Sequence, residues 1–239
     1  MLLEFYLPQM LGLFRKNIDK MELTLGGDHG KGAFTFIACL IVRFEDPLEE
    51  PQVLEFQIGE IDSEKDSMEL LLPLVEKLGE GILSMNPKGE GDCTFMVCRK
   101  ADGELLLHFD ETEAEEQGGE VVLLNTKLEL YVNGDYKFLF MMAGRSGYCG
   151  GYCLYCRLRQ SEWKRLHKTL DRTDCGVEEW TIEALCQIAL EQEQQAGRGE
   201  TFRSVGVREA PVWPFISIRR MLMPILHELL GLGNDLMSN

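Results

Sequence analysis

The sequence lacks any uninterrupted run of about 18 apolar residues, the length that a membrane-spanning helix needs. Its first residues, MLLEFYLPQMLGLFRK, also lack the basic start and the small-residue cleavage site of a secretory signal. Both absences exclude the common routes into or across a membrane. We therefore expect an intracellular protein with no membrane partner.

Basic residues are scarce in this chain. Lys and Arg number 24 against 40 Asp and Glu, which gives a formal net charge of −16. A surface dominated by phosphate contacts needs clustered Lys and Arg, so this balance argues against one. Part of the acidic excess is concentrated in residues 110–120 and 49–69, and a local basic groove elsewhere is still compatible with the composition.

Common phosphate-binding loops and internal repeats are also missing. The glycine-rich segment GGDHGKG at 26–32 fits neither G-x-x-x-x-G-K-[ST] nor G-x-G-x-x-G. A chain of 239 residues with 45% hydrophobic content is nevertheless large enough for one large domain or two small ones.

The eight cysteines do not form a regular framework. They are unevenly spaced, and three of them stand in CGGYCLYC at 149–156, which favours a metal site with buried thiols over disulfides. Cys153 and Cys156 form a C-x-x-C pair that could supply two zinc thiolates, although a redox pair or coincidental core cysteines are alternatives. The candidates for the remaining ligands are Cys149, His167, Cys175, Cys186 and His227.

The first half of the chain predicts three strands and a helix. Residues 21–25 alternate weakly and stop at the glycine-rich segment, and 33–44 are apolar, β-branched and aromatic, which favours two strands joined by a turn. A third strand is predicted at 52–58. Leucines at helical spacing predict a helix at 68–83, where Pro73 either bends the helix or marks its first turn.

After this helix, a hairpin is predicted at 93–98 and 104–109. Strand character returns at 121–124 and 127–132 and ends at Asn133-Gly134-Asp135. Helices are expected at 162–170, 177–193 and 216–237, the last with a kink at Pro224.

Two aspartates follow predicted strands, Asp28 near the start and Asp135 past the middle. Taken alone, each is also typical of a solvated turn, because Gly and Asn-Gly favour turns. Together they match the ribonuclease H layout, in which neighbouring strands bring two distant carboxylates together. Carboxylates a few ångströms apart favour bound Mg²⁺ or Mn²⁺, and the chemistry would be two-metal phosphoryl transfer.

The segments GDYKFLFMMAGRSGYCGGYCLYCRL at 134–158 and PFISIRRMLMPILHELLGLGN at 214–234 resemble DDE transposases of mobile elements. Those proteins, Transib and the recombination-activating recombinase among them, carry a GD after a strand, a C-x-x-C zinc half-site and a downstream LH…GN helix. The resemblance covers residues 20–40 and 130–237.

This resemblance implies an α/β fold: a ribonuclease H-like mixed sheet with flanking helices, plus a zinc-stabilised helical insertion. The core would span 1–143, with an inserted hairpin at about 90–120, and the zinc-bearing helical region 144–239. DNA would be the partner, a homo-oligomer the assembly, and the nucleus the location in a eukaryote.

The same resemblance implies roles for individual residues. Asp28 and Asp135 would be the first two catalytic acids and would hold Mg²⁺ or Mn²⁺, and Cys153 and Cys156 would bind a structural Zn²⁺. His227 matches the family's helix histidine, as a metal ligand or an active-site contact, although a histidine on an apolar helix is more often a core residue.

The family's third acid, a glutamate on a helix, has no clear counterpart. Either Glu228 takes its place or the acid lies beyond Asn239, in which case the chain is a truncated and inactive core. The alternative function is a non-catalytic, zinc-stabilised protein-interaction module with an acidic surface. A metal-dependent nuclease is a third interpretation, close to the first.

Overall fold

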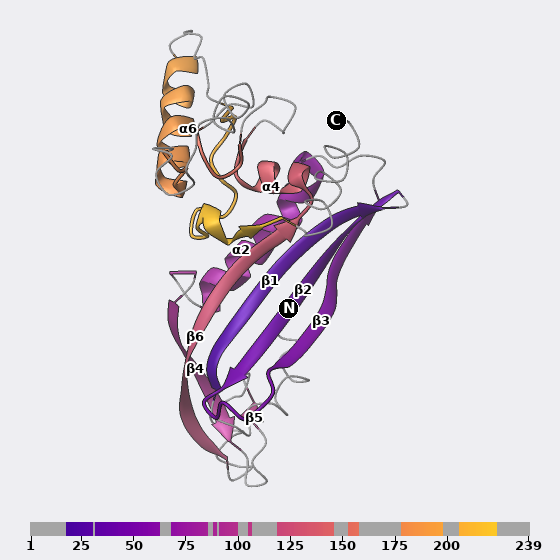
Figure 1. Cartoon of the computed structure of the whole chain (residues 1–239), viewed down its shortest axis with the longest axis vertical. Helices are drawn as coiled ribbons and strands as arrows, with labels where there is room; N and C mark the ends of the chain where they lie inside the picture. The colour runs from indigo at the N-terminus through magenta and orange to yellow at the C-terminus, as the bar shows by residue number, and fades with distance from the viewer. Residues whose placement is uncertain are drawn as a thin grey trace, which may run out of the picture. The chain divides into compact units, whose positions relative to one another are not determined.

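The computed structural model describes residues 18–30, 32–62, 68–85, 88–89, 91–99, 105–106, 119–145, 153–157, 178–197 and 206–223. Its elements are labelled in Figure 1. The strands are β1 (Ile18–Gly30), β2 (Ala33–Phe44), β3 (Gln52–Asp62), β4 (Gly91–Arg99), β5 (Leu105–Leu106), β6 (Glu120–Gly134) and β7 (Met221–Leu222). The helices are α2 (Met68–Met85), α4 (Tyr136–Met142), α6 (Ile182–Ala196) and the 3₁₀ turn η3 (Ile218–Arg220).

The seven strands form one mixed sheet in the order β3-β2-β1-β6-β4-β5, and β7 pairs with β6. The long strand β6 changes neighbours along its length. Its first half pairs antiparallel with β4, from Arg99↔Glu120 to Gly91↔Leu128, whereas its end pairs parallel with β7 at Val132↔Met221. The predicted α/β class, a mixed sheet with flanking helices, is therefore confirmed.

Strands β1 and β6 are neighbours that run in the same direction. Near their starts, the Thr126 hydroxyl donates to the carbonyl of Asp19 at 3.4 Å. Near their ends, a Cβ on Gly134 would lie 3.1 Å from the carbonyl oxygen of Gly27. Because the residue numbers rise together in both pairs, the strands are parallel. Two parallel neighbours need a long connection, and the chain between β1 and β6 contains β2, β3, α2, β4 and β5.

The chain divides into two compact units. The first contains Met1–Leu25, Phe36–Glu60 and Lys77–Leu130, and the second contains Gly26–Thr35, Ile61–Glu76 and Tyr131–Asn239. Both Asp28 and Asp135 belong to the second unit.

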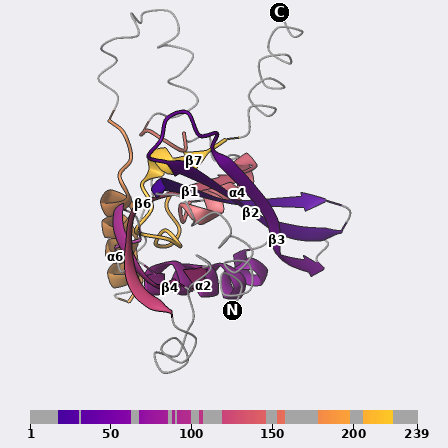
Figure 2. The ribbon, with the colours of Figure 1, turned by 90° about the horizontal axis from the view of Figure 1, so that it is seen from below.

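In the first unit, one face of the sheet is buried. Strand β2 alternates strictly, and its inward residues from Phe36 to Phe44 are at most 7% exposed. This is the two-residue period of a strand with one face on a core. Figure 2 shows helix α2 on one side of these strands, and its Ile82 is buried.

The core of the second unit joins segments from distant parts of the sequence. Trp213 is 1% exposed, and its indole Nε1 donates to the carbonyl of Val75 at 2.9 Å. The other large, fully buried side chains of this core are Phe34, Leu71, Phe138, Leu139, Phe140, Met142, Leu154 and Leu185.

Most predicted elements of the first half are confirmed. The strand at 33–44 has those bounds, the strand at 52–58 extends to Asp62, and the helix at 68–83 extends to Met85. Pro73 lies inside that helix, so the first-turn interpretation is wrong. The predicted hairpin is confirmed over the described residues, where β4 and the two residues of β5 pair at Cys98↔Leu106; the rest of 104–109 lies outside the described residues.

The prediction that the first strand stops at the glycine-rich segment is wrong, because β1 continues to Gly30. Glycine disfavours strands when local preference decides. Here β1 is hydrogen-bonded on both sides, to β2 and β6, and aromatic rings occupy the space beside Gly27. Tertiary packing therefore overrides the local signal.

Two helix predictions also need correction. The helix predicted at 177–193 begins only at Ile182, because the Thr181 hydroxyl accepts from Ala184 N and caps it. The helix predicted at 216–237 is wrong over 216–223, where the chain forms η3 and then β7, because Met221 and Leu222 pair with β6. Residues 224–237 and the helix predicted at 162–170 lie outside the described residues. In the described part, no helix is long and apolar enough to cross a membrane.

Candidate functional site

Asp135 links the end of β6 to the start of α4 and caps that helix. Its Oδ1 accepts from Phe138 N at 2.7 Å, and its carbonyl accepts from Leu139 N at 3.0 Å. A carboxylate is favoured there, because it satisfies a free amide and lies at the positive end of the helix dipole. Within the described part of the chain, Oδ2 accepts no hydrogen bond, so it can face a cation.

Asp28 lies in β1, two residues before the strand ends. Its backbone follows Gly27, whose carbonyl oxygen lies beside Gly134, and Asp135 follows Gly134. Asp28 in β1 and Asp135, directly after the end of β6, thus each follow one of two glycines that lie side by side in the same unit. The side chain of Asp28 lies outside the described part of the structure.

The C-x-x-C pair lies in a short segment that is held to the residues before α6. Trp180 N donates to the carbonyl of Tyr155 at 2.9 Å, and Cys156 forms an antiparallel bridge with Glu179. Cys153 is buried, Cys156 is partly exposed, and both are free thiols. The segment is therefore well fixed around its two sulfur atoms.

A complete zinc site is not found among the described residues, where no three His, Cys, Asp or Glu side chains gather in a group that could hold a metal. Cys186 is described and lies on α6, where burial raises the pKa of its thiol and disfavours the thiolate that zinc needs. The other proposed ligands and the third-acid candidate lie outside the described residues: Cys149, His167, Cys175, His227 and Glu228.

Tyr136, which the sequence argument missed, connects the α4 start to the cysteine segment. The pKa of its phenol responds to groups of that segment, namely the thiols of Cys153 and Cys156 and the backbone of Leu154. Burial raises the pKa of Tyr136, and the neighbouring thiols of Cys153 and Cys156 raise that pKa further. The phenol therefore stays protonated beside the two sulfur atoms, one residue after Asp135.

Arg145 was also missed, and among the described residues of this unit it is a buried cation. It is 3% exposed, and its Nη1 donates to the carbonyls of Cys153 and Leu154, the latter at 3.2 Å. Its guanidinium lies over the rings of Phe140 and Trp180, 5.4 and 4.8 Å from their centroids. A buried cation needs hydrogen-bond acceptors and aromatic faces around it, and Arg145 has both. We call it a clamp because it holds the carbonyls of the cysteine segment in place. Its position in GRSG, just after an apolar run, was the one available signal.

A cavity of about 380 Å³ lies next to the cysteine segment, lined by Tyr155, Glu179, Arg219, Met221, Leu222 and Met223. At its edge, Arg219 Nε donates to Glu179 at 2.8 Å. Arg157 forms an ion pair with Glu178 at 3.0 Å. These two cations, which could contact a DNA backbone, therefore already have acidic partners.

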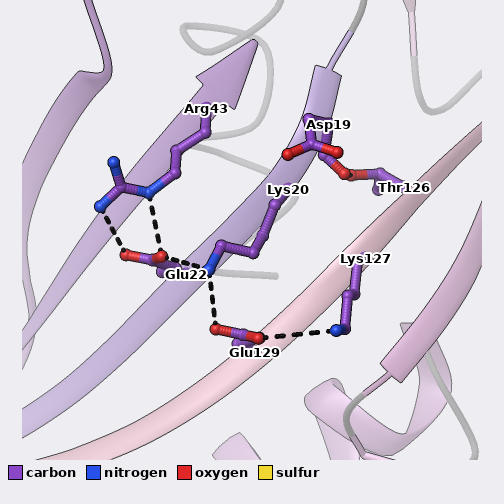
Figure 3. A network of polar contacts seen from close by, with 7 residues as sticks. All are labelled: Asp19, Lys20, Glu22, Arg43, Thr126, Lys127 and Glu129. Carbon is purple, nitrogen blue, oxygen red and sulfur yellow. Dashed lines mark hydrogen bonds and ion pairs between the residues drawn. The ribbon is translucent and has the colours of Figure 1, made fainter. Parts of the chain in front are cut away.

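The first unit contains a separate charged network across β2, β1 and β6, shown in Figure 3. Arg43 donates twice to Glu22, and Lys20 bridges Glu22 and Glu129 at 2.7 and 3.1 Å. Hydrogen bonding from Arg43 lowers the pKa of Glu22, and hydrogen bonding to Glu22 raises the pKa of Lys20. Because each acid has a cation beside it, the network is suited to fixing strand register rather than to binding metal.

Comparison with known proteins identifies no family: no protein-family model and no curated protein matches this sequence. The function must therefore be inferred from the residues themselves.

Proposed function

We propose that the chain is a ribonuclease H-like nucleotidyltransferase core of the DDE transposase kind, acting on DNA. Asp28 and Asp135 would hold Mg²⁺ or Mn²⁺. The main support is the adjacency of Gly27 and Gly134 on parallel strands, because it makes the two aspartates neighbours. An acid beside another acid is unfavourable unless a cation neutralises both.

The order of the strands supports the same proposal. Strands β3, β2 and β1 are followed by α2, and β6 then lies beside β1 and continues the sheet to β7. The ribonuclease H fold has three leading strands, a helix, and a fourth strand beside the first that ends at the second acid. In this interpretation β4 and β5 are the inserted hairpin.

The geometry of Asp135 supports a metal at this place. Asp135 uses Oδ1 to cap α4, which fixes the carboxylate and leaves Oδ2 for a hard cation. Two such metal ions supply a nucleophile and stabilise the leaving oxygen in phosphoryl transfer. Asp135 and Asp28 would bind and orient these metal ions. The third acid would be Glu228 or a residue beyond Asn239.

Cys153 and Cys156 are the proposed ligands of a structural Zn²⁺. The support is that both thiols lie in one segment, whose carbonyls are held by Arg145. His227 is among the proposed remaining ligands. A closed zinc site would stabilise this region directly, since metal binding and folding are coupled.

The sharpest test compares wild type with Asp135→Asn in Mn²⁺ binding and in Mg²⁺- or Mn²⁺-dependent cleavage of DNA. Asparagine caps helices as well as aspartate, so the variant removes the charge and keeps the fold. We expect Mn²⁺ binding, and any cleavage, to be lost. Unchanged Mn²⁺ binding in Asp135→Asn would refute the proposed site.

A second candidate function is a zinc-stabilised protein-interaction module with an acidic surface. It is favoured by the net charge of −16 and by the pairing of Arg157 and Arg219 with glutamates. The two functions differ in DNA binding. A DNA-binding core should lose affinity steeply with added salt, whereas the interaction module should not bind DNA at all.

A further inference from the structure

Two glycines precede the two candidate metal-binding acids, and the space beside both glycines is occupied by one aromatic ring. A Cβ on Gly134 would overlap Cδ1 of Phe138 and lie 3.1 Å from its Cε1. A Cβ on Gly27 would lie 3.3 Å from Cε2 of the same ring. The ring of Phe138 therefore packs against the backbone of β1 and β6 at the same level.

A second ring supports the first. Phe34, at the start of β2, fills the remaining space at Gly27, where its Cε1 lies 2.7 Å from the position of a Cβ. The two ring centroids are 5.6 Å apart, and Phe138 and Phe34 are 1% and 2% exposed. Such close-packed rings have little freedom to shift, so the backbone against them is held in place.

Phe138 also contacts the site through its backbone, because its N–H donates to Asp135 Oδ1. Residue 138 thus fixes the orientation of one carboxylate by its amide and the spacing of the two strands by its ring. Only glycine at 27 and 134 permits this approach, since any side chain there would collide with a ring or with Gly27 O.

We propose that Phe138 is a positioning residue, whose ring sets the separation of the β1 and β6 backbones at Gly27 and Gly134, directly before Asp28 and Asp135. This rests on the proposed function, because the separation matters only if the two acids share metal. A metal site is sensitive to small shifts of its ligands, and loss of a supporting contact lowers metal affinity by about 10–100-fold. Loss of the Phe138 ring should therefore lower metal affinity more than loss of another core ring that contributes equally to stability.

The test uses Mn²⁺ binding to the full chain, followed by electron paramagnetic resonance, in Phe138→Leu and in the matched control Phe140→Leu. Phe140 lies on the same helix and is fully buried, but it contacts Tyr136 and Arg145, and its ring is not among the atoms nearest to a Cβ on Gly27 or Gly134. Both variants keep the backbone N–H at 138. We expect Mn²⁺ affinity to fall about tenfold or more in Phe138→Leu and less than about threefold in Phe140→Leu, with similar losses of thermal stability.

A second pair of variants keeps Phe138 itself unchanged. Gly27→Ala places a methyl group against the Phe34 ring and should weaken Mn²⁺ binding. Adding Phe34→Leu removes the ring atoms that collide, and binding should recover in part. If the packing at Gly27 were only structural, these variants would change the unfolding temperature, but metal affinity would not fall in the first variant and recover in the second.

The outcomes separate the two proposals. If wild type binds Mn²⁺, Asp135→Asn abolishes it, and Phe138→Leu weakens it no more than Phe140→Leu, the positioning role is wrong and the metal site stands. Failure of Gly27→Ala to weaken binding would also overturn the positioning role. If wild type binds no Mn²⁺, the proposed function fails and the positioning role fails with it.

Discussion

The guanidinium of Arg145 lies 4.8 Å from the ring centroid of Trp180, and the same ring has Arg157 at 4.9 Å. Two cations therefore lie against one buried indole, but only Arg145 is itself buried and bonded to the cysteine segment. Arg157 is partly exposed and has Glu178 as its partner. The two arginines should differ in their contribution to stability.

We expect Arg145→Met to destabilise the protein by about 2–4 kcal/mol, because the carbonyls of Cys153 and Leu154 would lose their donor inside the core. Urea unfolding followed by fluorescence measures this. The control is Arg208→Met at an exposed position, where the change should stay within about 0.5 kcal/mol. Equal effects of the two substitutions would show that Arg145 is not a clamp.

The zinc proposal predicts about one zinc per purified chain, measured by plasma mass spectrometry. Cys153→Ser with Cys156→Ser should lose the metal and unfold at lower urea concentration, because the metal stabilises only the folded state. Cys39→Ser, a free and partly exposed thiol in the first unit, should keep it. Zinc-free wild type that is as stable as metal-loaded protein would contradict the proposal.

Much of the sheet could be predicted from the sequence because its signals are local. The alternation of β2 and the leucine spacing of α2 can be recognised within a few residues. The end of β1 could not, because its glycines are strand residues through pairing with β2 and β6, which are distant in the sequence. Met221 and Leu222 are apolar residues that suit a helix as well as a strand, and only their pairing with β6 makes them a strand.

The candidate site divides in the same way. Asp135 was predicted because a GD after a strand is visible in the sequence, although its cap on α4 was not recognised. Tyr136 and Arg145 were missed, since their importance comes from the cysteine segment folding back onto α4. Sequence spacing does not report such contacts.

Glycine substitutions should have opposite effects at two positions. Gly144 has φ +66°, and a Cβ there would overlap the Glu209 carbonyl and lie 2.8 Å from the Ala210 oxygen, so Gly144→Ala should destabilise by more than about 1 kcal/mol. Gly81 is inside α2 with open space beside it, so Gly81→Ala should stabilise by about 0.5–1 kcal/mol. Thermal unfolding distinguishes these results, and a destabilising Gly81→Ala would show that α2 packs more closely there.

The charged network should make stability depend on pH. The pKa of Glu22 is lowered below its ordinary value of 4.5, so its contribution is present above that value and is lost as pH falls through the lowered pKa. Glu22→Gln should therefore remove about 1–3 kcal/mol near neutral pH and flatten the acid side of the stability curve. Urea midpoints between roughly pH 3 and 7 measure this. The control is Glu80→Gln at an exposed position. A Glu22→Gln stability curve that runs parallel to the wild-type curve over this pH range would contradict the proposed link between Glu22 and stability.

The dual role of Asp135 allows stability and metal binding to be separated. Asp135→Ala removes the acceptor for Phe138 N and should lower the free energy of unfolding by about 0.5–2 kcal/mol. Asp135→Asn keeps an acceptor, so its free energy of unfolding should stay within about 0.5 kcal/mol of the wild-type value. Both variants should lose Mn²⁺ binding, because both remove the negative charge that faces the cation. Loss of stability and loss of metal in strict proportion would mean that Asp135 acts only as a helix cap. Loss of metal without loss of stability in Asp135→Asn is the result that a ligand role requires.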